Sequence, residues 1–262
     1  MAQFTEQDFF GGAIRGVVPQ GWIDASTLRE IPDHQELFLS PRTLSNLIIE
    51  VNQRVPQEEA LSTFTNPTHQ QQTPSAGSGS AASATPETVD QAAALYHLHD
   101  LCDEGDTLQV ITPPQRVSMA RLSTQPASST SSSSSSTSTS MPINAYKGVV
   151  SFTTPVRQRP GGGRVPAAVD GSTASVPDSI VASAALNGDS VGIPQTSKLT
   201  CHYLLVRLEP QETDLLVFLN VPHEEFNKSG DPNELSGEEA AAEETLAALR
   251  EKLEIRDWGL FA

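Results

Sequence analysis

The sequence is poor in the residues that mark several large protein classes. It has 16 Lys and Arg residues against 32 Asp and Glu among 262, a formal net charge of −16. Because nucleic-acid binding normally depends on a surplus of basic side chains, we expect no nucleic-acid ligand. Cys102 and Cys201 are too few for a disulfide framework. No apolar run reaches the length of a membrane span, so we expect no membrane association.

The first residues also lack the features of a targeting segment. The stretch "MAQFTEQDFFGG" has neither the basic region nor the apolar run of a secretory signal. We therefore expect a soluble intracellular protein. Strong acidity favours solubility and steers basic proteins toward the chain.

Three stretches have few core-forming residues, at about 66–84, 123–141 and 157–196. They are rich in Ser, Thr, Gly, Pro, Ala or Gln. Such segments bury too little apolar area to offset the entropy of ordering them. We expect disordered loop insertions in a single domain that spans residues 1–262.

The remaining chain alternates between strand and helix patterns. Apolar and polar residues alternate in Phe10–Ile14 and Gln35–Leu39, which we expect to be strands. Residues 43–55 fit a strand or a short helix. Further strands are expected at 107–111, 146–152, Cys201–Leu208 and Asp214–Val221. The last two strands flank a short turn and therefore predict a hairpin.

Two helices carry start signals. Thr85 can cap a helix that has Pro86 at its first position. The spacing of Ser236 and Glu239 predicts a capping box for a helix near the end of the chain. An apolar stripe follows it: Ala242, Leu246, Leu249 and Leu253. Strands and helices in this order predict an α+β fold with a mostly antiparallel sheet.

The segment "YHLHDLCDE" resembles a metal-ligand set, but helical geometry argues against one. His97 and His99 would lie about 200° apart around a helix, so they cannot face one ion. His99 and Cys102 share a predicted apolar helix face with Ala92, Leu95 and Tyr96. There is also no G-x-S-x-G elbow, and Gly161–Gly163 is not followed by the Lys-Ser/Thr of a phosphate loop. We expect the chain to bind no metal and no cofactor, and we expect that it is not an enzyme.

Four acids between Gly11 and Leu39 raise three alternatives: metal binding, acid–base chemistry or recognition of a basic partner. They are Asp24, Glu30, Asp33 and Glu36. Their spacing does not match a calcium loop, and Pro32 interrupts any single-loop geometry. Since connections between elements usually carry binding groups, a recognition surface is the most economical interpretation.

The same stretch carries a family resemblance. "FGGAI" followed by "VPQGWIDASTLREIPDHQELF" resembles the N-terminal signature of the Ran guanine-nucleotide release factors. Further similar motifs follow in order: "YHLHDL" at 96–101, "LLVRLEPQETDLLVFLNVP" at 204–222 and the terminal "DWGLFA". The three low-complexity stretches have no counterpart in the compact family pattern.

This resemblance implies both a fold and a function. The fold would be an α/β/α sandwich around an antiparallel sheet, similar to the photosystem protein PsbP. The function would be binding of the GTPase Ran, release of its GTP and support of nuclear import, in nucleus and cytoplasm. The Ran-contacting acids would centre on Asp33 and Glu36, with Asp24 nearby. Glu30 falls in the same stretch, at a position where the family varies.

Two other functions fit parts of the sequence. One is an adaptor whose Ser/Thr-rich loops bind partners after phosphorylation. The other is a PsbP-like extrinsic subunit, which would need a transit peptide that the sequence does not show. For the Ran-binding interpretation we expect a monomer with no chemical catalysis.

Overall fold

A seven-stranded, wholly antiparallel sheet forms the centre of the computed structural model, which describes residues 3–26, 31–65, 84–122, 143–155, 196–229 and 231–261. The strands lie in the order β3-β4-β5-β9-β8-β7-β6. Their bounds are β3 Ile23–Asp24, β4 Gln35–Leu39, β5 Asn46–Gln53, β6 Thr107–Val117, β7 Asn144–Pro155, β8 Thr196–Leu208 and β9 Thr213–Pro222. The central strands are buried on both faces, which explains the nearly continuous apolar runs of β8 and β9.

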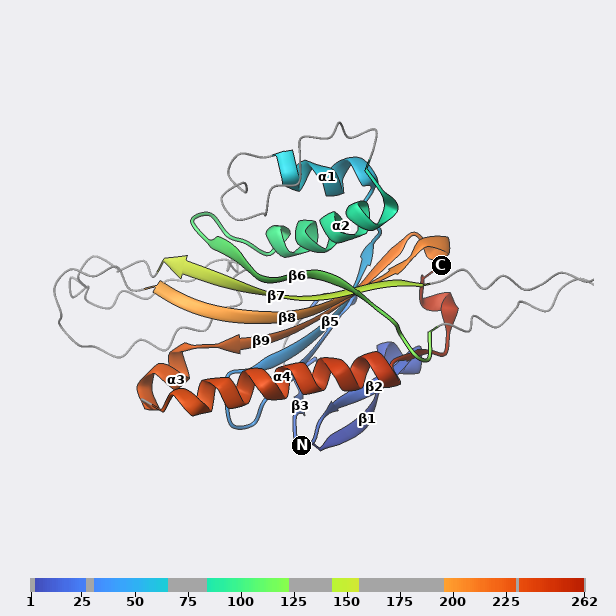
Figure 1. The fold of residues 1–262 in the computed structure, drawn as a ribbon. Helices are drawn as coiled ribbons and strands as arrows, with labels where there is room; N and C mark the ends of the chain where they lie inside the picture. The colour runs from blue at the N-terminus through green and yellow to red at the C-terminus, as the bar shows by residue number, and fades with distance from the viewer. Residues whose placement is uncertain are drawn as a thin grey trace, which may run out of the picture.

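Both faces of this sheet are covered (Figure 1). On one face lie α1 (Gln57–Thr65) and α2 (Pro86–Asp100). On the other lie α4 (Pro232–Lys252), preceded by the short α3 (Glu224–Ser229), and a second, small sheet. Each layer encloses its own apolar cluster. The predicted α/β/α sandwich is therefore confirmed.

The small sheet has the order β1-β2-β10 and packs beside α4. Its strands are β1 Phe4–Phe9, β2 Ile14–Pro19 and β10 Glu254–Ile255. A short 3-10 turn, η1 (Phe10–Gly12), joins the first two strands. Two other 3-10 turns are η3 (Glu209–Gln211), in the β8–β9 hairpin, and η4 (Trp258–Phe261), at the end of the described chain.

Several sequence predictions are confirmed element by element. The strand Gln35–Leu39 has the predicted bounds, and residues 43–55 contain the strand β5. Thr85 caps α2, and its side chain accepts a hydrogen bond from the Thr88 N–H at 3.2 Å. The other predicted strands form but run longer, because strand pairing extends β6, β7 and β8 beyond their periodic cores. The short helix α1 has no counterpart among the predictions.

The predicted strand Phe10–Ile14 is wrong. Phe10 through Gly12 turn the chain, and β1 begins earlier, at Phe4. Gly11 and Gly12 have φ values of 64° and 94°, in the region that glycine adopts at little cost. The Gly-Gly pair should therefore have been interpreted as a turn between two strands.

The predicted capping box at Ser236 is also wrong. The helix α4 begins at Pro232, and Asp231 is its N-cap, accepting from the Asn233 N–H at 2.9 Å. Ser236 lies inside the helix, and Glu239 accepts a hydrogen bond from Thr200 instead. An Asp followed by Pro at the first helical position was the stronger start signal. The apolar stripe predicted for this helix is buried as expected.

The three low-complexity stretches lie almost wholly outside the described residues. At their borders, Ala84 precedes α2 and Thr196 begins β8. No helix in the described ranges is long and apolar enough to cross a membrane.

A buried ion-pair cluster joins α2 to the sheet. The Arg207 guanidinium, 2% exposed, donates to Asp90 on α2 at 2.8 Å and to Asp214 on β9 at 3.0 Å. It also donates to the Val55 carbonyl oxygen at 2.7 Å. Since Arg207 and Asp214 pair directly across the β8–β9 hairpin, the register itself brings this cation and anion together.

The two carboxylates of the cluster are each held from a second side. The Nε2 atom of His97 lies 3.0 Å from Asp214, which also accepts from the Val55 N–H at 3.0 Å. Burial alone would raise the pKa of Asp214, but His97, Arg207 and Val55 together hold that pKa below its usual 3.8. Tyr146 donates to Asp90 at 3.2 Å. Every charge in the cluster thus has a partner, as buried charges require.

Gly148 on β7 makes room for a buried tyrosine. It pairs with Tyr203 on β8, and a Cβ atom at Gly148 would lie 2.6 Å from Tyr203 Cζ and 2.7 Å from the Thr112 carbonyl oxygen. Both contacts are impossible without movement in a packed layer. We expect Gly148→Ala to lower the free energy of unfolding by about 1–3 kcal/mol, measured by urea denaturation.

Gly237→Ala is the matched control. Gly237 lies within α4, where an added Cβ would meet no atom within 4 Å. Alanine there should stabilise the protein by up to about 1 kcal/mol, because it favours the helical backbone. If Gly148→Ala unfolds at the wild-type urea concentration, Tyr203 moves freely and the close packing at this pair is not required.

Candidate functional site

Two of the predicted acidic residues, Asp24 and Glu36, lie close together at one edge of the large sheet. The two-residue strand β3 pairs with β4, so that Asp24 lies opposite Phe38. Glu36 precedes Phe38 by two positions and faces the same side of the sheet. We call the three described acids of this region, Asp24, Asp33 and Glu36, the acidic edge. Glu30 lies outside the described residues.

Asp24 is exposed and held by its own turn. Its Oδ1 atom accepts a hydrogen bond from the Ser26 N–H at 2.9 Å. The Ser26 hydroxyl in turn accepts from the Leu37 N–H on β4 at 3.0 Å. A surface carboxylate is thereby fixed relative to the sheet.

Asp33 is exposed in the turn that leads into β4. The Gln35 N–H donates to the Pro32 carbonyl at 2.9 Å, which closes this turn. The Val51 N–H donates to the His34 carbonyl at 2.9 Å, and His34 lies 3.7 Å from Glu50. The backbone around Asp33 is thus anchored to β5 while its side chain is free to meet a partner.

Glu36 differs from the other two acids because it is half-buried. Its Oε1 atom accepts a hydrogen bond from the Phe10 N–H at 2.5 Å. Burial raises the pKa of Glu36 above its usual 4.5; the Phe10 hydrogen bond opposes this, and the Asp24 charge adds to it. The structure therefore brings Glu36 and Asp24 together, whereas Asp33 lies in the preceding turn.

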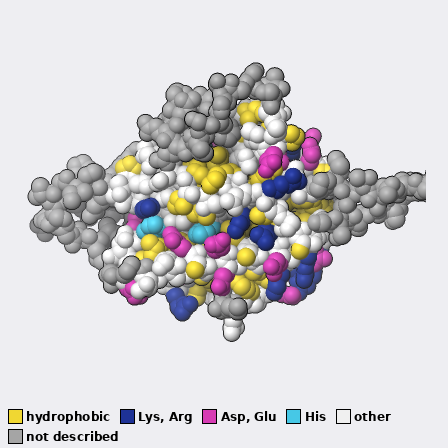
Figure 2. Space-filling view, in the orientation of Figure 1, with side chains coloured by type: hydrophobic (Ala, Val, Ile, Leu, Met, Phe, Trp, Pro, Cys, Tyr) yellow, Lys and Arg dark blue, Asp and Glu magenta, His cyan; other side chains and the backbone are white. Residues whose placement is uncertain are grey.

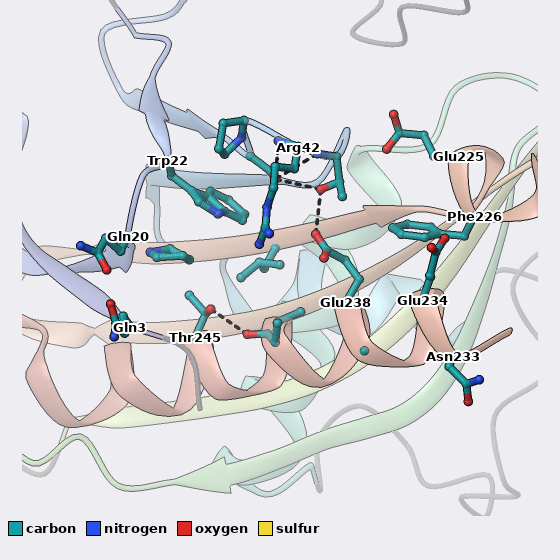
Figure 3. A pocket seen from close by; sticks show the side chains of 18 residues that line it. Gln3, Gln20, Trp22, Arg42, Glu225, Phe226, Asn233, Glu234, Glu238 and Thr245 are labelled. Atoms are coloured by element: carbon teal, nitrogen blue, oxygen red, sulfur yellow. Dashed lines mark hydrogen bonds between the residues drawn. The ribbon is translucent and has the colours of Figure 1, made fainter. Parts of the chain in front are cut away.

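A hollow of about 680 Å³ lies between α4, the β2–β3 turn and the β4–β5 connection, and no residue of the acidic edge lines it (Figure 3). Figure 3 shows the side chains of Trp22 and Arg42 reaching into it. On the helix side, Glu238 accepts from Thr43 at 2.8 Å. The lining thus combines an aromatic ring, a cation and several carboxylates.

Sequence reasoning missed this hollow, because α4 lies about two hundred residues from the signature segment in the chain. One residue of the sequence does indicate a contact surface here. Trp22 follows Gly21 in a turn and is only half-buried, and a partly exposed tryptophan often marks a contact surface.

A row of charged and histidine side chains crosses the face that carries α4 (Figure 2). Along the seam between α4 and the sheet, Lys147 donates to Glu243 at 3.3 Å and Thr200 donates to Glu239 at 3.0 Å. His223 lies 3.6 Å from the same Glu239. Burial lowers the pKa of His223, so this seam holds a largely neutral imidazole at neutral pH.

Helix α2 contains both His97 and His99, which confirms that they diverge around a helix. Of the predicted apolar face, Ala92 and Leu95 are buried as expected, whereas His99 is only half-buried. His97, not His99, turns toward the sheet and contacts Asp214. Cys102 follows the end of α2 at Asp100, and burial raises the pKa of its thiol to about 11. In the described part of the chain, no three His, Cys, Asp or Glu side chains are arranged to hold a metal ion.

The fold and its surface define a class: an α+β sandwich with acidic side chains at one edge of its large sheet and a separate hollow beside α4. Within that class, the chain belongs to the Mog1 family. The family model described as "Ran-interacting Mog1 protein" matches residues 7–222, most of the chain and all of the acidic edge.

Named relatives match over short stretches. The "Nuclear import protein MOG1" of Saccharomyces cerevisiae is 60% identical over 37 residues, 14% of this chain and 17% of its own length. The human "Ran guanine nucleotide release factor" is 50% identical over 42 residues, 16% of this chain and 23% of its own length. A "Probable ran guanine nucleotide release factor" of Dictyostelium discoideum is 42% identical over 50 residues, 19% of this chain and 26% of its own length. The matched stretches thus span about a quarter or less of these relatives.

Solved structures support the fold over the full length. The Saccharomyces cerevisiae Ran-binding protein Mog1p aligns with a TM-score of 0.50 and 18% identity, covering 100% of both chains. A point mutant of the protein Mog1 gives the same TM-score at 17% identity and covers 99% of this chain and 100% of its own. At this identity the likeness establishes the fold alone.

Proposed function

We propose that this chain binds the small GTPase Ran through the acidic edge and promotes release of its GTP, in support of nuclear protein import. The observation that carries the proposal is the family match over residues 7–222, which includes the edge. The names of the relatives, a nuclear import protein and Ran guanine nucleotide release factors, support it.

The charge of the chain fits a partner with a basic surface. The net charge is −16, and Asp24 and Asp33 are exposed at the acidic edge. Exposed charges of this kind mainly accelerate association and favour the correct orientation of the partner. Because salt screens them, binding should weaken as ionic strength rises.

Nucleotide release follows from thermodynamic linkage. A protein that binds the nucleotide-free GTPase more tightly than the loaded form must lower nucleotide affinity by the same factor. Acidic side chains can engage basic groups that would otherwise face phosphate. No covalent bond is made or broken, so the chain would act as a regulator of a GTPase rather than as an enzyme.

The chain would form one Ran-binding domain with three insertions, act as a monomer without metal or cofactor, and work in nucleus and cytoplasm.

A nucleotide-release titration tests this function. Ran loaded with a fluorescent GTP analogue is mixed with increasing amounts of the chain, and loss of bound nucleotide is followed over time. We expect release to accelerate and to saturate with concentration. A release rate that stays at the spontaneous value, together with no binding to nucleotide-free Ran, would exclude the proposal.

A further inference from the structure

The turn Phe10–Gly12 adopts a backbone conformation that its first residue disfavours. Phe10 has a φ of 51°, and Gly11 and Gly12 follow at 64° and 94°. Positive φ is uncommon for a bulky residue and persists only where the surroundings over-determine it. Such strained positions cluster at binding sites and switch regions.

Two side chains of β4 hold this turn. The ring of Phe38 packs edge-on against Phe9, with ring centroids 5.6 Å apart. Glu36, two residues earlier on the same face, accepts the hydrogen bond from the Phe10 N–H at 2.5 Å. One strand thus fixes both the last residue of β1 and the first residue of the turn.

The carboxylate of Glu36 is poorly placed to meet a basic partner directly. It is half-buried, one oxygen is engaged by Phe10, and burial raises its pKa. Its charge is thus less favourable than that of an exposed glutamate, whereas accepting a hydrogen bond requires no charge. The exposed carboxylate nearby is that of Asp24.

The outer surface of the turn is open. Gly11 is exposed, and an added Cβ at Gly11 or Gly12 would meet no atom within 4 Å. A partner can therefore approach the backbone closely here, beside the charge of Asp24.

We propose that Glu36 is a positioning residue: it holds the Phe10–Gly12 turn, and this turn is a contact element for a basic segment of the GTPase. The inference rests on the proposed function and assigns different roles to acids that the sequence treats as equivalent. Asp24 and Asp33 supply charge to the partner, and Glu36 supplies an acceptor to its own chain.

Glu36→Gln and Glu36→Ala separate these roles. Glutamine keeps an acceptor oxygen and loses the charge; alanine loses both. We expect Glu36→Gln to bind Ran loaded with fluorescent GTP within about threefold of wild type, and Glu36→Ala to bind at least about tenfold more weakly. Equal, large losses in both variants would show that the Glu36 charge meets the partner and would overturn the inference.

Hydrogen exchange of the Phe10 amide provides a readout that does not need Ran. Protection should be similar in wild type and Glu36→Gln and should fall by at least about tenfold in Glu36→Ala, because the amide loses its acceptor. Unchanged protection in Glu36→Ala would refute the positioning role. Failure of wild type to bind Ran would instead count against the proposed function, and the exchange result would still decide what Glu36 holds.

Gly11→Asn tests the turn as a contact element. Asparagine tolerates positive φ, so the turn should keep its Phe10 protection while a side chain now projects from its outer face. We expect Ran binding to weaken by about tenfold or more. The control is Gly105→Asn, at another positive-φ glycine in the loop between α2 and β6, which should bind like wild type. Wild-type binding by Gly11→Asn would place the contact elsewhere.

Discussion

Arg207→Ala is expected to remove most of the stability of the fold. The substitution leaves Asp90 without its cation and leaves Asp214 with only His97 and the Val55 N–H, where α2 packs on the sheet. Breaking a buried ion pair from one side typically costs about 3–5 kcal/mol. Since whole domains are stable by only about 5–15 kcal/mol, urea denaturation should show a transition shifted far toward zero denaturant or no cooperative transition.

Arg116→Ala serves as the matched control for the loss of an arginine. Arg116 lies exposed on β6 and donates to Asn144 at 2.8 Å. A surface contact of this kind is worth less than about 1 kcal/mol. A triple variant, Asp90→Asn, Arg207→Met and Asp214→Asn, should be less damaging than Arg207→Ala, because it leaves no unpaired buried charge. The argument fails if Arg207→Ala and Arg116→Ala unfold at the same urea concentration.

Asp24→Asn combined with Asp33→Asn should weaken Ran binding at least about tenfold without loss of stability. Asparagine at position 24 can still accept the Ser26 N–H, so the local turn is kept while the charge is removed. The loss should fall mainly on the association rate, and the dependence of that rate on salt should become shallower. Stopped-flow measurements with fluorescently labelled Ran at two ionic strengths measure both effects.

Glu58→Gln combined with Glu104→Gln is the control for the loss of two charges. Both acids are exposed, Glu58 on α1 and Glu104 in the loop after α2, away from the acidic edge. If this control reduced association as much as Asp24→Asn with Asp33→Asn, net charge alone would govern the encounter. The acidic edge would then have no special place in recognition.

Local sequence patterns were sufficient to predict those helices and strands whose bounds depend on neighbouring residues in the chain. The strand Gln35–Leu39 follows from alternation, and the start of α2 follows from Thr85 and Pro86. The register of the β8–β9 hairpin also places Arg207 opposite Asp214, a pair that the sequence alone could have suggested.

Local sequence patterns were insufficient to predict the role of a side chain whose hydrogen-bond partner lies far away in the chain. Glu36 and Asp33 look alike in the sequence, yet Glu36 is bound to an amide 26 residues away. The choice of His97 over His99 for the buried face depends on Asp214, 117 residues away from His97. Glu239 fits a capping box by spacing, but the preference of Asp231 and Pro232 for the first turn prevails.

The ends of the large sheet bear on how copies of the chain behave toward one another. In the described residues, β3 offers only two residues at one edge. At the other edge, β6 contains Pro113 and Pro114 within a shift of its register between Thr112 and Gln115. Proline has no N–H to donate, and an irregular edge strand is a poor template for pairing with another strand. Strand addition from a second copy is thus confined to a short run at either end. Both edges of the sheet thus disfavour the edge-to-edge pairing through which sheets aggregate.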